Sequence, residues 1–262
     1  MNKVLKFSAT LVFLFTAFLL LYPLPGHFRF NLVALKDSLS PTVSGHFRYK
    51  LVVIVQTPEG PKEGNSVREV SLKRKNSLFS SSGKSTKVNI KGEAVVVDLG
   101  NRGKLFALMD FDAAHKVVYQ TFSLGDPRRE ALAIKAYEEL YEKVGDQRKK
   151  LDPSMLYYPI LVSFKDLSAP KSVVEVLERD PDDIREQGKI ETHKDNFEEI
   201  FGEGVSLKGV YIQMTDEVVT EQISSTLPWL NQLEGKYISE RSSGSGPELW
   251  KRLHEGNFRR FQ

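Results

Sequence analysis

An uncharged apolar run near the N-terminus limits what this chain can fold into more than any other feature. Residues 7–22 (FSATLVFLFTAFLLLY) carry no charge, and Lys3 and Lys6 precede them. Such a run has no polar face for the surface of a globular domain, and its length is close to that of a bilayer-spanning helix. It predicts an N-terminal transmembrane helix whose anchoring side chains include Phe7, Leu11, Phe13, Phe15, Phe18, Leu20 and Tyr22.

The residues that follow the run favour an uncleaved anchor over a removed signal peptide. Cleavage sites need small residues at the first and third positions before the cut, and the bulky Leu24 occupies the third position before a cut after Gly26. Ser38 and Ser40 have the required spacing, but Pro41 follows and the site is remote from the run. A cleaved signal peptide stays open as the alternative.

Composition indicates an ordinary globular domain behind this segment. Of 262 residues, 40% are hydrophobic and 27% are charged, which excludes wholesale disorder. The absence of cysteine excludes disulfides, thiol catalysis, zinc sites with Cys ligands and a lipid on an N-terminal Cys. The net charge of +3 is too small to indicate nucleic acid binding.

Charge is distributed unevenly along the chain. Residues 1–92 hold 14 basic and 4 acidic side chains, and residues 93–262 hold 23 and 30. One hypothesis is that the basic region lies against anionic lipid headgroups. The other, which we favour, is that the acidic residues neutralise the basic ones within the fold.

Alternation dominates the first part of the domain. Phe47, Tyr49 and Leu51 alternate with charged residues, which is the period-two pattern of a strand with one buried face. Further elements are predicted as a hairpin partner at 66–72, strands at 87–91 and 94–99, a turn at 100–103 and a strand at 104–109.

The second part mixes helices and strands. Helices are expected over 127–144, 193–201 and 216–226, and strands over 159–164, 173–177 and 205–214. We therefore predict an α+β fold. It consists of a transmembrane segment (1–25), a linker (26–45), one domain with an antiparallel sheet and a few packed helices (46–238), and a linker with an amphipathic tail (239–262).

One phosphate-binding motif is incomplete. The segment GKST at 83–86 resembles the end of a phosphate-binding loop, but Leu78 stands where the motif needs its first glycine. Val88 and Ile90 then alternate as in a strand, whereas such a loop must open a helix. We therefore expect no nucleotide, and no other cofactor is indicated.

Asp110, Asp112 and His115 form the best candidate for catalytic chemistry. On an extended strand the two carboxylates share a face, and a turn would bring the imidazole close, as acid–base catalysis or a divalent cation requires. The interpretation that we favour is that both Asp side chains make turn hydrogen bonds after the strand. The other histidines lack a second ligand at metal-binding spacing, so no metal is expected.

Aromatic and basic residues near the C-terminus are candidates for partner binding. Trp229, in the segment LPWL, is either an exposed anchor for a partner or a side chain packed under the sheet. Trp250, Arg259 and Arg260 lie in a tail that interleaves aromatic and basic residues, as do segments that bind membrane interfaces or acidic partners. Docking of the tail onto the domain is the alternative.

Several short segments carry a resemblance to a known family. They are GEAVVVDLG at 92–100 with LFAL at 105–108, YKL at 49–51, and LPWL at 227–230. Over residues 47–235 the chain resembles an uncharacterised family of N-terminally membrane-anchored alphaproteobacterial proteins with no assigned activity. The resemblance implies a single-pass anchor in the inner (cytoplasmic) membrane and a periplasmic domain, and it transfers no catalytic residue.

These observations favour an anchored protein that binds rather than catalyses. Its periplasmic domain is expected to bind an envelope protein or to act in envelope assembly, while the N-terminal segment contacts the lipid bilayer. Lys3 and Lys6 favour the matching orientation, with the N-terminus in the cytoplasm. Two alternatives stay open: a periplasmic hydrolase that uses Asp110, Asp112 and His115, and a module that binds lipid surfaces.

Overall fold

The computed structural model describes residues 43–76, 84–109, 114–123, 139–155, 157–179, 192–233, 235–238 and 249–261. The chain divides into two compact units, Met1–Thr42 with Lys75–Ser85, and Val43–Arg74 with Thr86–Gln262. The described part of the first unit consists of strand ends at 75–76 and 84–85. Every contact, hollow and site discussed below belongs to the second unit.

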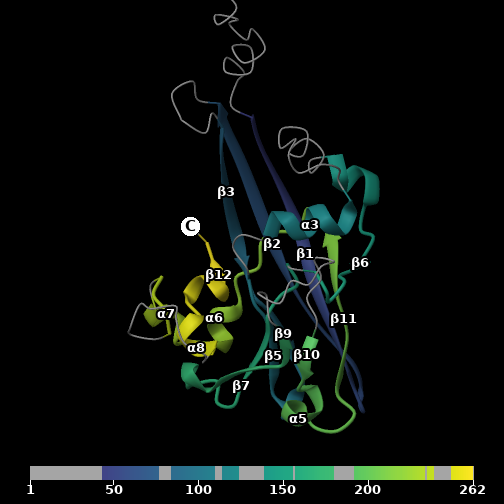
Figure 1. The fold of residues 1–262 in the computed structure, drawn as a ribbon, viewed down its shortest axis with the longest axis vertical. Coiled ribbons are helices and arrows are strands. Elements are labelled where there is room, and N and C mark those ends of the chain that lie inside the picture. Colours follow the sequence, from purple (N-terminus) through teal and green to yellow (C-terminus); the bar gives the residue numbers. More distant parts are fainter. Residues whose placement is uncertain are drawn as a thin grey trace, which may run out of the picture. The chain divides into compact units, whose positions relative to one another are not determined.

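A six-stranded sheet is the largest element of the fold (Figure 1). Its strands lie in the order β12-β3-β2-β1-β11-β6, with bounds β1 Val43–Thr57, β2 Gly60–Asn76, β3 Lys84–Glu93, β6 Lys149–Lys150, β11 Ser206–Met214 and β12 Arg259–Arg260. The predicted hairpin is confirmed, and its second strand is longer than residues 66–72 because antiparallel pairing runs from Thr57 opposite Gly60 to Val43 opposite Arg74. The other edge of β1 pairs with β11, antiparallel, with Tyr49 opposite Met214.

A smaller antiparallel sheet has four strands in the order β4-β5-β7-β8. Their bounds are β4 Val95–Asp98, β5 Lys104–Ala107, β7 Leu161–Phe164 and β8 Val173–Glu175. The predicted turn at 100–103 is confirmed as a short 3₁₀ turn, η1 (Gly100–Arg102), between β4 and β5. After β8 the chain bends at Val176 into β9 (Leu177–Arg179), which pairs with β10 (Thr192–Asp195) as a separate two-stranded ribbon.

Two apolar clusters lie on the two faces of the smaller sheet, because side chains alternate along each strand. One face packs against the large sheet, where Tyr49, Leu51 and Val53 of β1 meet Val97 and Leu161 in one buried cluster. The opposite face carries Phe106, Val162 and Phe164, which pack with residues from the C-terminal part of the chain. Trp229 and Phe258 lie among them, with ring centroids 5.5 Å apart at an edge-to-face angle.

The helices are short. Their bounds are α3 Ala114–Phe122, α5 Phe197–Phe201, α6 Ile223–Thr226, α7 Leu230–Leu233 and α8 Leu249–Arg252, with 3₁₀ turns η2 Pro170–Ser172 and η3 Glu255–Asn257. Helix α3 was not among the predicted elements. The helix predicted over 127–144 is described only at 139–144, which is helical, and its predicted end at Gly145 is confirmed by a left-handed φ of +55°. Its remaining residues lie outside the described part.

Two predicted helices begin later than expected. Residues 193–195 belong to β10, and helix α5 begins only at Phe197, whose N–H donates to the Asp195 carboxylate at 3.0 Å. The helix predicted from Asp216 is limited to Ile223–Thr226. The Arg48 guanidinium donates to the carbonyl oxygens of Asp216 and Glu217, which lie in an irregular segment with a bend at Glu217.

A buried polar cluster at the end of β3 explains where α6 starts. Glu93 is 4% exposed, and its carboxylate accepts the N–H groups of Gln222 at 2.7 Å and Ile223 at 2.8 Å, the first donors of that helix. Arg68 is 5% exposed and donates to the carbonyl oxygens of Glu93 at 3.2 Å and Ala107 at 3.4 Å. We call this cluster, Ser66, Arg68, Gly92 and Glu93, the β3 node.

The α+β class with antiparallel sheets is confirmed, and the tail is part of the domain. Phe258 is fully buried, and Arg259 and Arg260 pair with Glu93 and Gly92 of β3. No helix among the described residues is long and apolar enough to cross a membrane. The predicted anchor residues, Phe7, Leu11, Phe13, Phe15, Phe18, Leu20 and Tyr22, lie outside the described part.

Candidate binding groove

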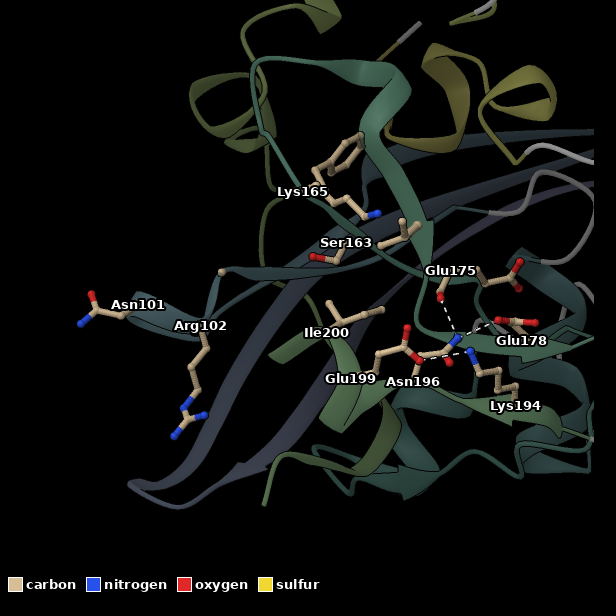
Figure 2. Close-up of a pocket in the computed structure, with 13 residues that line it drawn as sticks. Asn101, Arg102, Ser163, Lys165, Glu175, Glu178, Lys194, Asn196, Glu199 and Ile200 are labelled. Atoms are coloured by element: carbon tan, nitrogen blue, oxygen red, sulfur yellow. Dashed lines mark hydrogen bonds and ion pairs between the residues drawn. The ribbon is translucent and has the colours of Figure 1, made fainter. Parts of the chain in front are cut away.

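A polar hollow of about 750 Å³ opens where helix α5 faces the end of the smaller sheet (Figure 2). We call it the α5 groove. Six segments contribute to it: η1, β7, β8, β9, β10 and α5. The lining residues are Asn101, Arg102, Gly103, Ser163, Phe164, Lys165, Val174, Glu175, Glu178, Lys194, Asn196, Glu199 and Ile200.

The strands β7 and β8 form one side of the groove. Ser163 lies opposite Val174 in the antiparallel pairing, so both side chains project from the same face of the sheet. That face also carries Leu161, which packs in the cluster between the sheets. The groove is therefore the place where the core between the two sheets gives way to polar side chains. The Ser163 hydroxyl donates to the carbonyl oxygen of Lys104 at 3.0 Å.

Arg102 fixes the end of the groove next to η1. Its guanidinium binds the Glu59 carboxylate, with the closest contact at 2.9 Å, and donates to the carbonyl oxygen of Phe201 at 3.0 Å. It thus joins the β1–β2 turn, η1 and the end of α5. A Cβ on Gly202 would lie 2.7 Å from an Arg102 nitrogen, so the chain needs glycine there. The hydrogen bond from Arg102 lowers the pKa of Glu59 to about 2.

Asn196 fixes the side of the groove opposite Arg102. It is 5% exposed, and its Nδ2 donates to Glu178 Oε1 at 2.7 Å and to the carbonyl oxygen of Glu175 at 3.3 Å. Its backbone N–H donates to the carbonyl oxygen of Val176 at 2.9 Å. This orientation of the amide is the favourable one, because reversing it would place Oδ1 against two acceptors.

The Oδ1 atom of Asn196 is buried and has no hydrogen-bond partner among the described residues. A buried acceptor without a partner costs about 1–3 kcal/mol. Most buried polar groups in folded proteins have a partner, so this atom is an exception that destabilises the fold beside the hollow.

Charged side chains in the groove fall into two groups. Arg102 pairs with Glu59, and Lys194 pairs with Glu199 at 3.1 Å. The Lys165 ammonium makes no hydrogen bond or ion pair within the described part of the chain, and Glu178 contacts only the neutral Asn196 amide. Figure 2 shows the hydrogen bonds and ion pair gathered around Asn196, with Lys165 apart from them near β7.

This lining suits a polar ligand. Its side chains are mostly charged groups, amides and a hydroxyl, whereas sites for apolar ligands are lined mainly by aliphatic and aromatic side chains. No group of three or more His, Cys, Asp or Glu side chains that could hold a metal ion occurs among the residues that the structure describes.

A second hollow, of about 230 Å³, lies beside the start of β1. It is lined by His46, Phe47, Arg48, Tyr141, Met214, Thr215 and Asp216. Arg48 is occupied there, because it binds the Glu69 carboxylate at 2.7 Å as well as the Asp216 carbonyl. With its cation engaged and its smaller volume, this hollow is the weaker candidate.

The predicted site residues do not lie in the groove where they are described. Asp110 and Asp112 lie outside the described part, and so does the side chain of His115, whose backbone is in α3. Trp229 is 7% exposed, and its indole N–H donates to the carbonyl oxygen of Leu167 at 2.9 Å. Its indole therefore packs within the domain.

The tail residues mostly hold the tail onto the domain. Arg259 binds the side chains of Glu255, Ser224 and Asn231, and Arg260 lies opposite Gly92 in the β12–β3 pairing. The half-buried Trp250 ring has the Lys171 and Lys251 ammonium groups 5.3 and 5.4 Å from its centroid. These contacts agree with docking of the tail, the alternative that the sequence left open.

Sequence reasoning did not single out Lys165, Glu178 or Asn196. Asn196 lies within the helix that was predicted over 193–201, and Lys165 follows a predicted strand. Nothing local marks them as a site, because pairing of distant strands brings them together.

No protein-family model matches the chain, and neither a curated protein nor a solved structure matches it. The class of protein is therefore judged from the geometry of the groove and the N-terminal sequence.

Proposed function

We propose that the protein is a single-span, membrane-anchored binding module of the bacterial envelope. In this proposal residues 7–22 hold the chain in the inner membrane, and the domain lies in the periplasm and binds an envelope protein without catalysis. The α5 groove is the binding site. The observation that carries the proposal is this groove, a polar hollow in which Lys165 and Glu178 have no ion-pair partner among the described residues.

The chemistry of the groove supports binding over hydrolysis. A serine nucleophile needs a base to take its proton. The Ser163 hydroxyl instead donates to the Lys104 carbonyl, and no histidine lines the groove among the described residues. The side chains that remain can form hydrogen bonds and ion pairs with a partner.

Site-directed photocrosslinking in cells tests the proposal. A photoreactive amino acid replaces Asn101, an exposed residue at the edge of the groove, in the full chain. The matched control places it at Val218, which is 79% exposed and does not line the groove. We expect a discrete crosslinked protein from position 101 and not from position 218. The same product from both positions would contradict the groove as the binding site.

Membrane fractionation of the same cells tests the anchor separately. The chain should resist alkaline carbonate extraction and keep its N-terminal residues, because an uncleaved apolar helix stays in the bilayer. Recovery of a soluble form that starts near residue 27 or residue 41 would contradict the anchor and leave the groove to be judged from the crosslinks.

A further inference from the structure

We propose that the α5 groove binds an amphoteric peptide segment of a partner protein, one that carries both a carboxylate and a basic group. The inference rests on the proposed function and adds the chemistry of what is bound. It follows from the charges that remain in the groove after the internal pairs are formed.

Internal ion pairs neutralise three of the six charged side chains that line the groove. Arg102 is neutralised by Glu59, and Lys194 by Glu199. Glu175 also has a bonding partner. Lys165 is then a cation without a counterion within the described chain, and the Glu178 carboxylate is hydrogen-bonded there only to a neutral amide. The groove therefore offers one charge of each sign that has no ion pair among the described residues.

The two free charges come from different elements. Lys165 directly follows β7, and Glu178 lies on β9, beyond the bend at Val176. Figure 2 shows Glu178 within the group around Asn196 and Lys165 outside it. A ligand with a carboxylate near one end and a basic group near the other can satisfy both charges in one orientation only.

Other ligand classes fit these charges less well. A polyanion such as a nucleic acid or a phosphate-rich surface would meet Glu178 and Glu199 as like charges, and a polycation would meet Lys165 and Lys194. An acyl chain would remove the charged lining from water without compensation. A peptide segment supplies both charges and also backbone N–H and C=O groups that can bond to the amide of the exposed Asn101.

The size of the hollow is consistent with a short segment. Its volume of about 750 Å³ lies within the range of roughly 300–1,000 Å³ that is typical of ligand sites. Arg102 and Asn196 hold its two sides by hydrogen bonds within the domain. The groove is thus formed before the ligand arrives, which lowers the ordering cost of binding.

Binding of labelled peptides to the full chain in lipid nanodiscs tests the inference. The panel contains capped peptides with one Asp and one Lys separated by a Gly/Ser spacer, the same peptide in reversed order, and all-acidic, all-basic and uncharged versions. We expect one amphoteric order to bind about fivefold or more tightly than every other peptide at low salt, with the preference weakened by added salt.

Charge reversal assigns the preference to named residues. Lys165→Glu and Glu178→Lys should each abolish it, and the double variant should prefer the reversed order of the two charges. Lys208→Glu is the matched control, because Lys208 is exposed and the substitution makes the same charge change outside the groove, so it should leave the preference unchanged.

Three outcomes would overturn the inference: equal binding of uncharged or single-sign peptides, no effect of the Lys165 and Glu178 reversals, or the same effect from Lys208→Glu. Absence of any peptide binding would also overturn it. If crosslinking from position 101 still captures a partner in that case, the proposed function stands and only the peptide chemistry fails. If neither peptide binding nor a crosslinked partner from position 101 is found, both proposals fail.

Discussion

The β3 node and the α5 groove differ in whether their charged side chains are buried and hydrogen-bonded. In the node, Arg68 and Glu93 are almost fully buried, and hydrogen bonds to backbone groups satisfy both side chains. In the groove, Lys165 is exposed, and its ammonium makes no hydrogen bond or ion pair with the described chain. Both sites lie at strand ends of one domain. The difference in how their charged side chains are paired therefore reflects a different role for each site.

Burial explains this difference. A charge removed from water is costly unless hydrogen bonds replace its hydration, so the node can persist only with its donors and acceptors matched. A charge at an open groove stays hydrated and needs no partner for folding. The node therefore serves stability, while the groove keeps bonding capacity for another molecule.

The largest effect is expected from Glu93→Ala. This change leaves the buried N–H groups of Gln222 and Ile223 without their acceptor. We expect a loss of about 2–5 kcal/mol in the free energy of unfolding, measured by urea denaturation of the full chain in detergent. Glu93→Gln is the control: it keeps a side-chain oxygen and should lose less. Equal stability of Glu93→Ala and the parent would contradict the role of the node.

The next largest effect on stability is expected from a matched pair of glycine substitutions. Gly92 in the node and Gly103 in the groove have φ values of +137° and +101°, so both positions disfavour a side chain. A Cβ on Gly92 would also lie 2.9 Å from Arg68 Cγ, whereas a Cβ on Gly103 would meet nothing within 4 Å. Gly103→Ala should lose about 1 kcal/mol and Gly92→Ala clearly more. The opposite order, by thermal denaturation, would refute the contrast.

Acid should weaken the packing of the C-terminal tail beside the node. Burial, together with the nearby Arg260 charge, lowers the pKa of His254 below its usual 6.5. The unfolded chain then binds the proton more readily, so stability is complete above about pH 6.5 and falls as the pH drops below it. The charged imidazole also cannot accept the Gly256 N–H, which donates to Nδ1 at 3.0 Å.

His254→Asn tests this pH dependence. Asn caps a helix start through its side-chain oxygen but does not titrate in this range. The loss of stability between pH 7.5 and 5, followed by denaturant midpoints, should be smaller in the variant. An identical pH profile in both proteins would rule out His254 as its source.

The smallest effects are expected in the groove. Lys165→Ala removes an exposed side chain that makes no hydrogen bond or ion pair with the described chain, and Glu178→Gln keeps an oxygen for Asn196 Nδ2. Each should change the free energy of unfolding by no more than about 0.5 kcal/mol. A loss comparable to that of Glu93→Ala would show that the groove charges are structural, and the contrast between the two regions would fail.

Local sequence patterns predicted most strands and few helix boundaries. Alternation at Phe47, Tyr49 and Leu51 and the glycine-rich turn at 100–103 are local signals, and both elements formed as expected. The start of α6 depends on Glu93, which lies far away in the sequence. The pairing of Arg259 and Arg260 with β3 also has no local signal, since two residues show no period.

The groove was harder to predict than the fold. Its residues come from six segments, and each one alone is an ordinary charged or polar residue near a strand end. The sequence drew attention instead to Asp110, Asp112, Trp229 and Trp250. Trp229 belongs to the apolar cluster on the face of the smaller sheet that points away from the large sheet. An aromatic residue near the end of a chain can complete a core or bind a partner, and its local sequence does not distinguish the two.

The pairing of β1 with β11 has a consequence for how the domain forms. The β1–β2 hairpin joins neighbouring parts of the chain, but β1 also needs Met214 opposite Tyr49, and nearly all the remaining strands lie between them in the sequence. Contacts between such distant residues carry a large loop-closure entropy and slow the folding of single domains. The hairpin should therefore wait with an unpaired edge until β11 arrives, and another chain could pair with that edge during the delay.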